Sequence, residues 1–176
     1  MPDLRRLFEV NLKTLPGKVL IAMALDAWAR TFPGASLDQV LTPAARPLVE
    51  EIGRNCLGTT LQLLDSAPAA VSLGFTFLST PPWEVQPWES IVADNNPGQR
   101  ATGAPILVVQ GAADTIVAPE ITADLVTHLC GAKEDVQLLS LPGVGHVPTG
   151  HDAAAQVAQW IADRFAGAPT TPTCPS

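Results

Sequence analysis

The sequence contains few charged residues and no concentration of positive charge. Asp, Glu, Lys and Arg make up 15% of its 176 residues, and the formal net charge is −7. Arg5, Arg6, Lys13, Lys18 and Arg30 are scattered along the chain and form no stripe. A nucleic-acid-binding face must neutralise phosphates with clustered basic side chains, so this composition argues against DNA or RNA as a partner.

The sequence also lacks an apolar run long enough to cross a bilayer. The best candidate, "VLIAMALDAWA" at 19–29, is short and interrupted by Asp26, whereas a spanning helix needs about 20 mostly apolar residues. The opening "MPDLRRLFEVNLKTLPGK" has no apolar core of the kind a signal peptide needs. We therefore expect no transmembrane segment, and expect that any export signal lies outside these residues.

Cysteine is sparse, and the spacing of Cys56, Cys130 and Cys174 matches no zinc motif. Cys174 lies in a Pro/Thr-rich tail of the kind that stays mobile unless it is tied down. We predict a Cys130–Cys174 disulfide, which would attach this tail to the end of a helix and imply an oxidising compartment. Cys56 would then be either a buried small hydrophobe or one half of a bridge to a missing segment.

Apolar residues, in contrast, are abundant. They make up 47% of the chain, and the mean hydropathy is +0.22. Small proteins have a poor ratio of volume to surface, so this composition is unusually apolar for a soluble chain of this length. We expect that part of the apolar surface belongs against something absent from these residues.

The pattern of apolar residues divides the chain into three parts. Residues 1–80 show apolar spacings of three and four, which predict helices, and residues 81–104 form a Pro- and Asn-rich connection. The piece "PPWEVQPW" within it has the composition of a polyproline ligand, although Pro-rich linkers with buried tryptophans are far commoner. Residues 105–176 carry the alternating strands and helices of an α/β core with a tail.

In this last part, the runs at 104–111 and 136–143 predict strands, the first of them buried on both faces. The segments 119–130 and 152–165 predict helices. Strand, helix, strand and helix joined by short loops form a βαβα unit, whose two strands must be parallel and joined by a right-handed crossover.

Each predicted strand is followed by a Gly-containing loop with a polar candidate. Asp114 lies three residues after Gly111, and His146 lies three residues after Gly143. Neighbouring parallel strands lie about 5 Å apart, so loops of this length can bring a carboxylate to an imidazole. Taken singly, Asp114 fits an ordinary turn or helix cap and His146 fits a turn. Together they have the order and spacing of the acid and base of a nucleophile–base–acid triad.

The other two histidines fit a surface role better. His151 is expected to begin the last helix as a surface or capping residue, and His128 is expected to be solvated on its helix face.

The segments "APILVVQGAADTIVAPEIT", "LPGVGH" and "WIADRFAGAP" resemble the C-terminal third of an α/β-hydrolase, most closely the secretory lipase family of fungal lipase A-like enzymes and actinobacterial esterases. "DNNPG" at 94–98 is similar to that family too. The resemblance is specific over 94–174 and loose before it. It implies that Asp114 and His146 complete a Ser–Asp–His triad and that residues 1–80 belong to a helical cap.

The chain departs from this family in its nucleophile. The family's serine lies in a G-x-S-x-G elbow upstream of the cap, and none of the seven serines here has glycine at both positions; they are Ser36, Ser66, Ser72, Ser79, Ser90, Ser140 and Ser176. The oxyanion loop and about six strands of the sheet are also missing. We therefore expect the N-terminal sheet and the nucleophile elbow to be absent, as in a truncated reading frame, a deliberately shortened protein or one part of a split enzyme.

The resemblance implies a carboxylic-ester hydrolase, a lipase or esterase, which uses no metal or organic cofactor and acts on an acyl ester or lipid. The full-length form would be secreted or held in the cell envelope. The chain alone would be inactive, and its partner would be the missing N-terminal half or a second chain. The alternative is a non-catalytic hydrolase remnant that serves as a binding or interaction module.

Overall fold

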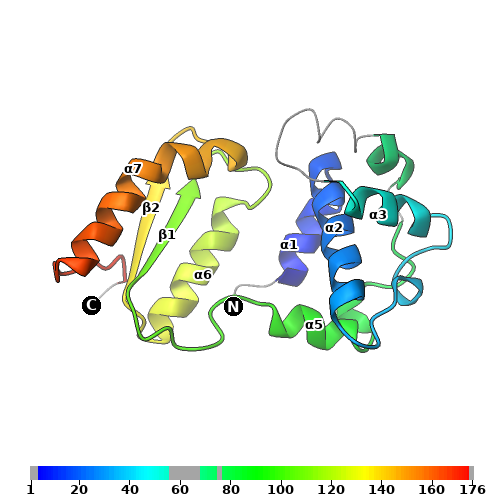
Figure 1. The fold of residues 1–176 in the computed structure, drawn as a ribbon, viewed down its shortest axis with the longest axis horizontal. Helices are drawn as coiled ribbons and strands as arrows, with labels where there is room; N and C mark the ends of the chain where they lie inside the picture. The colour runs from blue at the N-terminus through cyan, green and yellow to red at the C-terminus, as the bar shows by residue number, and fades with distance from the viewer. Residues whose placement is uncertain (1–3, 56–67, 75–76, 175–176) are drawn as a thin grey trace. The chain divides into compact units, whose positions relative to one another are not determined.

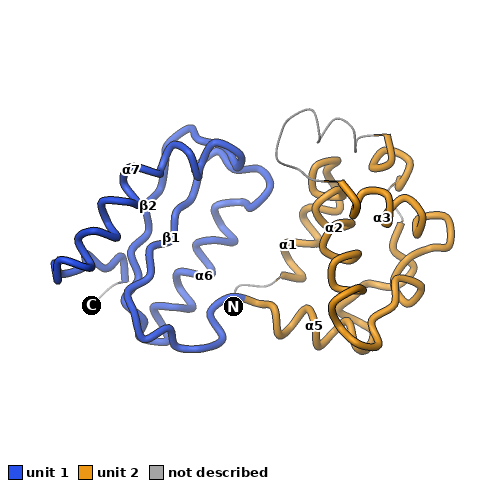
Figure 2. Tube along the Cα trace, in the orientation of Figure 1, with its two compact units in different colours: residues 1–3, 97–176 blue, residues 4–96 orange. Residues whose placement is uncertain are grey.

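The computed structural model describes residues 4–55, 68–74 and 77–174. The chain forms two units, one of Leu4–Asn96 and the other comprising the described residues of Pro97–Ser176 (Figure 2). None of the helices within the described ranges is long and apolar enough to cross a membrane. Cys56 lies outside these ranges, as do residues 56–67 and 75–76 of the part predicted to be helical.

The first unit is helical. Its helices include α1 (Leu4–Asn11), α2 (Leu15–Thr31), η1 (Leu37–Gln39), α3 (Arg46–Gly53), η2 (Pro82–Glu84) and α5 (Trp88–Asp94), and residues 68–72 are helical as well. Helix α2 begins at Leu15, directly after its capping residue Thr14. The side chain of Thr14 accepts a hydrogen bond from the amide of Gly17, and Pro16 fits the first helical turn because no intrahelical partner is needed there.

The Pro-rich segment contributes directly to the core of this unit. It contains η2 and α5, and Trp88 is completely buried among apolar side chains of α2, α3 and their neighbours. The indole Nε1 of Trp88 donates to Gln39 Oε1 at 2.9 Å, which satisfies its one polar group. The segment is therefore a structured part of the helical unit and cannot serve as an extended polyproline ligand while Trp88 is buried.

The second unit is a βαβα arrangement. Its elements are β1 (Ile106–Gly111), α6 (Pro119–Gly131), β2 (Val136–Leu141) and α7 (His146–Phe165). The two strands are parallel and pair in register from Ile106 with Val136 to Gly111 with Leu141. Helix α6 packs on one face of this sheet and α7 on the other (Figure 1). The prediction of an α/β unit with two parallel strands is confirmed.

The two faces of the sheet are covered to different degrees. Ile106, Val108 and Val136 pack with α6 in a small apolar cluster. Val109, on the opposite face, is only half-buried beside α7. The prediction that the first strand is buried on both faces was therefore wrong, because Ile106–Val109 are all only half-buried; on the side of Val109, the small side chains of α7 leave the sheet partly uncovered.

Helix α7 begins at His146, not at residue 152 as the sequence pattern predicts. Pro148 falls in the first turn of the helix, where the amide it lacks would have had no intrahelical partner. The hydroxyl of Thr149 donates to the carbonyl of Gly145 at 2.6 Å, within this same turn. His146 is therefore the first residue of a helix, and His151 lies in the helix instead of beginning it.

The tail is held at three points, on α6, on β2 and on Asp135, the residue before β2. A disulfide joins Cys130 and Cys174. The amide of Thr173 donates to the carbonyl of Val136 at 2.7 Å, and the amide of Leu138 donates to the hydroxyl of Thr173 at 2.8 Å. Farther back, Thr170 donates to Asp135 Oδ2 at 2.6 Å. The sequence alone pointed to the thiol as the tail's main attachment; in the structure, threonine hydrogen bonds share that role.

Candidate active site

Asp114 lies in residues 111–117, here called the acid loop, which start at the last residue of β1 and lead toward α6. Its side chain is buried, with 7% of the residue exposed. Its Oδ1 accepts from the amides of Ile116 at 2.8 Å and Val117 at 2.9 Å, which is the Asx-turn arrangement expected of an ordinary loop aspartate. Its Oδ2 takes no part in those two bonds and points toward the loop that follows β2.

His146 completes the pair. Its Nδ1 lies 2.8 Å from Asp114 Oδ2, a distance at which an Nδ1–H donates to the carboxylate. The imidazole is 41% exposed while the carboxylate is 5% exposed. A buried carboxylate thus holds one ring nitrogen, and Nε2 of a partly exposed ring remains for proton transfer. This is the geometry of the acid and base in a triad.

Gly111 allows the two loops to come together. A Cβ at this position would lie 2.5 Å from the carbonyl oxygen of Val144 and 2.6 Å from Thr149 Oγ1. The amide of Ala113 donates to that same carbonyl of Val144 at 2.9 Å. The loop 142–145 that leads from β2 to His146, here called the base loop, therefore packs directly on the backbone of the acid loop, a contact that only glycine permits at position 111.

Gln110 is a polar residue of the site that sequence reasoning did not find. It is the penultimate residue of β1 and is buried, with 6% exposed. Its Nε2 donates to the carbonyls of Gly111 at 2.8 Å and Val117 at 3.1 Å, and its Oε1 accepts from the hydroxyl of Thr122 on α6. The available signal was a glutamine in the otherwise apolar run "ILVVQG".

The other histidines lie apart from this pair. His151 is 93% exposed at its side chain and contacts the adjacent Asp152 at 3.0 Å. His128 on α6 was expected to be solvated, but that was wrong: its Nε2 lies 3.1 Å from the carbonyl of Gly98, and the residue is half-buried. This contact attaches Gly98, near the start of the unit, to α6.

The described serines lie in other structural settings. Ser140 belongs to strand β2, and Ser36 caps η1 by accepting from the amide of Asp38 at 3.3 Å. Neither lies at a turn from a strand into a helix, where an activated serine of a hydrolase elbow would be. Ser66 and Ser176 lie outside the described residues.

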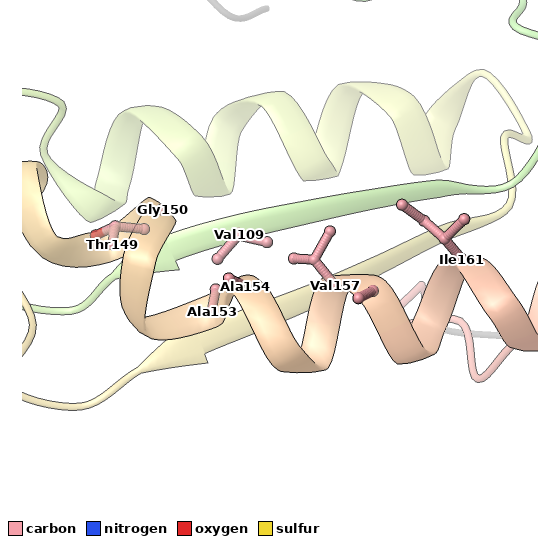
Figure 3. A pocket seen from close by; sticks show the side chains of 8 residues that line it. Val109, Thr149, Gly150, Ala153, Ala154, Val157 and Ile161 are labelled. Atoms are coloured by element: carbon pink, nitrogen blue, oxygen red, sulfur yellow. The ribbon is translucent and has the colours of Figure 1, made fainter.

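A groove of about 600 Å³ runs between β1 and α7 (Figure 3). It is lined by Val109, Thr149, Gly150, Ala153, Ala154, Val157, Ala158 and Ile161. The lining is almost entirely apolar, and Asp114 and His146 take no part in it. The groove is therefore an uncovered patch of apolar surface and not the pocket around the proposed chemistry.

Asp114 can orient the imidazole of His146 and stabilise its protonated form, and His146 can then accept a proton from a nucleophile. Within the described ranges, no cluster of three or more His, Cys, Asp or Glu could hold a metal ion.

Comparison with curated proteins and with solved structures gave no match. A model of the secretory lipase family matches residues 9–173. The match spans both units and nearly the whole sequence, and we conclude that the chain belongs to the secretory lipase family.

Proposed function

We propose that this chain supplies the acid and base of a serine carboxylic-ester hydrolase, with Asp114 as the acid and His146 as the base. The observation that carries the proposal is the 2.8 Å contact between His146 Nδ1 and Asp114 Oδ2 at the carboxyl ends of two parallel strands. Membership of the secretory lipase family supports a lipase or esterase acting on a lipid ester, and a secreted protein.

The reaction would run in two acyl transfers. His146 Nε2 takes the proton of a serine hydroxyl as the serine oxygen attacks the ester carbonyl, and then gives that proton to the departing alcohol. In the second transfer, Nε2 takes a proton from water, the resulting hydroxide attacks the acyl-serine, and the proton returns to the serine oxygen. Asp114 accepts from Nδ1–H throughout and stabilises the imidazolium.

The nucleophile, in this proposal, comes from a segment outside these 176 residues or from a second chain. None of the seven serines has the flanking glycines of a nucleophile elbow. The α/β part would then be the C-terminal portion of an α/β-hydrolase sheet. Residues 1–80 would form the helical cap, whose apolar side chains suit an acyl chain better than a charged substrate.

The free edge of β1 supports this arrangement. The amide of Ile106 donates to the carbonyl of Asp135, so alternation places the amides of Leu107 and Val109 on the edge away from β2. The tail residue Thr173 bonds the outer edge of β2, whereas no strand pairs with the outer edge of β1 among the residues that the structure describes. We infer that further strands of a hydrolase sheet would pair there.

The test compares the chain alone with the chain joined to an N-terminal segment that carries a G-x-S-x-G elbow from a secretory lipase. The isolated chain should neither hydrolyse p-nitrophenyl esters above background nor react with a serine-directed phosphonate, whereas the joined protein should do both. Steady turnover by the pure isolated chain, abolished by the phosphonate, would show that a serine within it is the nucleophile.

A further inference from the structure

The buried pair of Gln110 and Thr122 lies beside the acid loop and is not explained by packing alone. On the face of β1 that packs toward α6, Gln110 follows the apolar residues Ile106 and Val108. Both members of the pair are more than nine-tenths buried. Burying an amide and a hydroxyl is costly unless both are hydrogen-bonded, so an apolar pair would suffice if this position only filled space.

The amide of Gln110 joins the two ends of the acid loop. Its Nε2 donates to the carbonyl of Gly111, the first residue of the loop, at 2.8 Å, and to the carbonyl of Val117, the last, at 3.1 Å. The hydroxyl of Thr122 donates to Oε1. The two carbonyls decide which end of the amide carries the NH₂, because a flipped amide would present its oxygen to them, and the bond from Thr122 holds Oε1 in that orientation.

The two residues whose carbonyls Gln110 holds also contact Asp114. The carbonyl of Gly111 accepts from the amide of Asp114 at 3.1 Å, and Val117 donates its own amide to Asp114 Oδ1 at 2.9 Å. The span of the loop therefore sets the position of Oδ1. Both oxygens belong to one planar carboxylate, so the position of Oδ1 also determines where Oδ2 points. The distance between the two ends of the loop therefore controls the contact of Oδ2 with His146.

We propose that Gln110 is a positioning residue, oriented by Thr122, which sets the acid loop so that Asp114 Oδ2 meets Nδ1 of His146. This inference deepens the proposed function and rests on its assignment of acid and base. In this proposal Gln110 controls the tautomer of His146, although the glutamine contacts neither the imidazole nor a substrate.

The test reads that tautomer in the 176-residue chain itself, by long-range ¹H–¹⁵N spectroscopy of histidine-labelled protein at a pH where the imidazole is neutral. The native protein should hold His146 as the Nδ1–H tautomer. Gln110→Met and Thr122→Val should each convert it to a mixture of both tautomers. Thr122→Ser retains a hydroxyl and should keep the native form.

Gln137→Met is the matched control. Gln137 is a glutamine on the other strand, whose Oε1 accepts from Trp160 Nε1 on α7 at 2.9 Å, away from the acid loop. Its replacement should lower the melting temperature without changing the tautomer of His146, as expected of a merely structural role.

If Gln110→Met folds and still holds His146 as the Nδ1–H tautomer, the proposal is overturned. If Gln110→Met does not fold, an unchanged tautomer in Thr122→Val overturns it. A native chain without a dominant Nδ1–H form would overturn both this inference and the assignment of the acid and base. A joined protein without esterase activity, together with a tautomer that responds as expected, would count against the proposed function alone and support the role of Gln110.

Discussion

At the scale of single residues, the two oxygens of Asp114 have separate tasks. Oδ1 accepts from two backbone amides of its own loop, and Oδ2 contacts His146. A carboxylate can do both because each of its oxygens only accepts hydrogen bonds. The same side chain therefore shapes the loop and orients the imidazole.

Replacing Asp114 with asparagine should separate these tasks. The amide oxygen can still accept from Ile116 and Val117, so the loop and the fold should persist. The NH₂ group would then face His146 Nδ1, which must accept, and the ring would take the Nε2–H tautomer that cannot serve as a base. In the joined enzyme we expect a loss in kcat on the order of 10⁴. Steady-state kinetics, with a thermal unfolding scan to verify folding, measures this.

An Asp114→Asn enzyme with a native melting temperature and kcat within a few-fold of native would contradict the assignment of the acid. Asp152→Asn is the control, because Asp152 contacts only the exposed His151 among the hydrogen bonds described. That variant should keep native kinetics.

The sequence predicts the roles of Asp114 and His146 but not the role of Gln110. Asp114 and His146 were predicted because each follows a strand-like run at a fixed distance from a glycine, and the structure brings their side chains to 2.8 Å. Gln110 could not be assigned a role in this way. Its partner Thr122 lies 12 residues away on another element, and their contact exists only after α6 has packed on the sheet.

At the scale of elements, the close packing of β1 on the start of α7 depends on Gly111. An alanine Cβ there would meet the carbonyl of Val144 at 2.5 Å, so the base loop must move. We expect Gly111→Ala to lower the free energy of unfolding by about 1–3 kcal/mol, the usual range for overpacking. It should also weaken the Asp114–His146 contact. Chemical denaturation and the tautomer of His146 measure the two effects.

Gly150→Ala is the matched control for this substitution. Gly150 lies in α7, and a Cβ there would meet no atom within 4 Å. Alanine favours helix over glycine, so this variant should be more stable by about 0.5–1 kcal/mol. Equal stability of the Gly111→Ala and native proteins would show that the two loops are not packed as the structure has them.

The tail provides the second prediction at this scale. The disulfide Cys130–Cys174 closes a separation of 44 residues. In the loop-entropy model, this restriction of the unfolded chain stabilises the protein by about 4 kcal/mol. Cys174→Ser, or reduction of the native protein, should lower the free energy of unfolding toward that amount in denaturant titrations.

Thr173→Ala serves as the comparison for the disulfide. It removes only the bond from the amide of Leu138 to the threonine hydroxyl, and so should cost about 1 kcal/mol. If Cys174→Ser cost no more than Thr173→Ala, the threonine hydrogen bonds and not the disulfide would hold the tail.

Element positions were predictable where the apolar pattern was long. The strands and α6 lie close to the predicted ranges, since buried runs and a proline in the first turn mark them. The start of α7 was missed by six residues, because "HVPTGH" contains a proline and a glycine and has no apolar period. Its first turn depends on the contact with β1, which local sequence does not encode.

At the scale of the whole molecule, the apolar excess of the sequence has a structural counterpart. The face of the sheet toward α7 is partly open, and the exposed side chains include Ile161 at 45% and Phe165 at 91%. Next to this face lies the outer edge of β1, with which none of the described strands pairs and which presents the backbone groups of Leu107 and Val109. These features are what an α/β sheet would show where its remaining strands join.

Amide hydrogen exchange at the outer edge of β1 should show whether the added N-terminal segment pairs a strand with it. In the isolated chain, the amides of Leu107 and Val109 should exchange quickly, and in the joined protein they should become protected as a neighbouring strand pairs with them. The amide of Val108 points toward β2 in the register of the sheet and should be protected in both. Exchange rates at Leu107 and Val109 that do not change in an active joined protein would place the additional strands elsewhere.

The last prediction concerns the triad as a unit in the joined, active protein. His146→Ala removes the general base and should lower kcat about as far as replacing the elbow serine with alanine. The double variant should be scarcely worse than either single one, because the serine without its base is no longer activated. His151→Ala is the control, since that side chain is 93% exposed and contacts only its neighbour Asp152 in the described hydrogen bonds. Its kcat should match the native value. If His151→Ala abolished turnover while His146→Ala kept it, the wrong histidine has been assigned; if both variants kept it, the contact between His146 and Asp114 has no catalytic role.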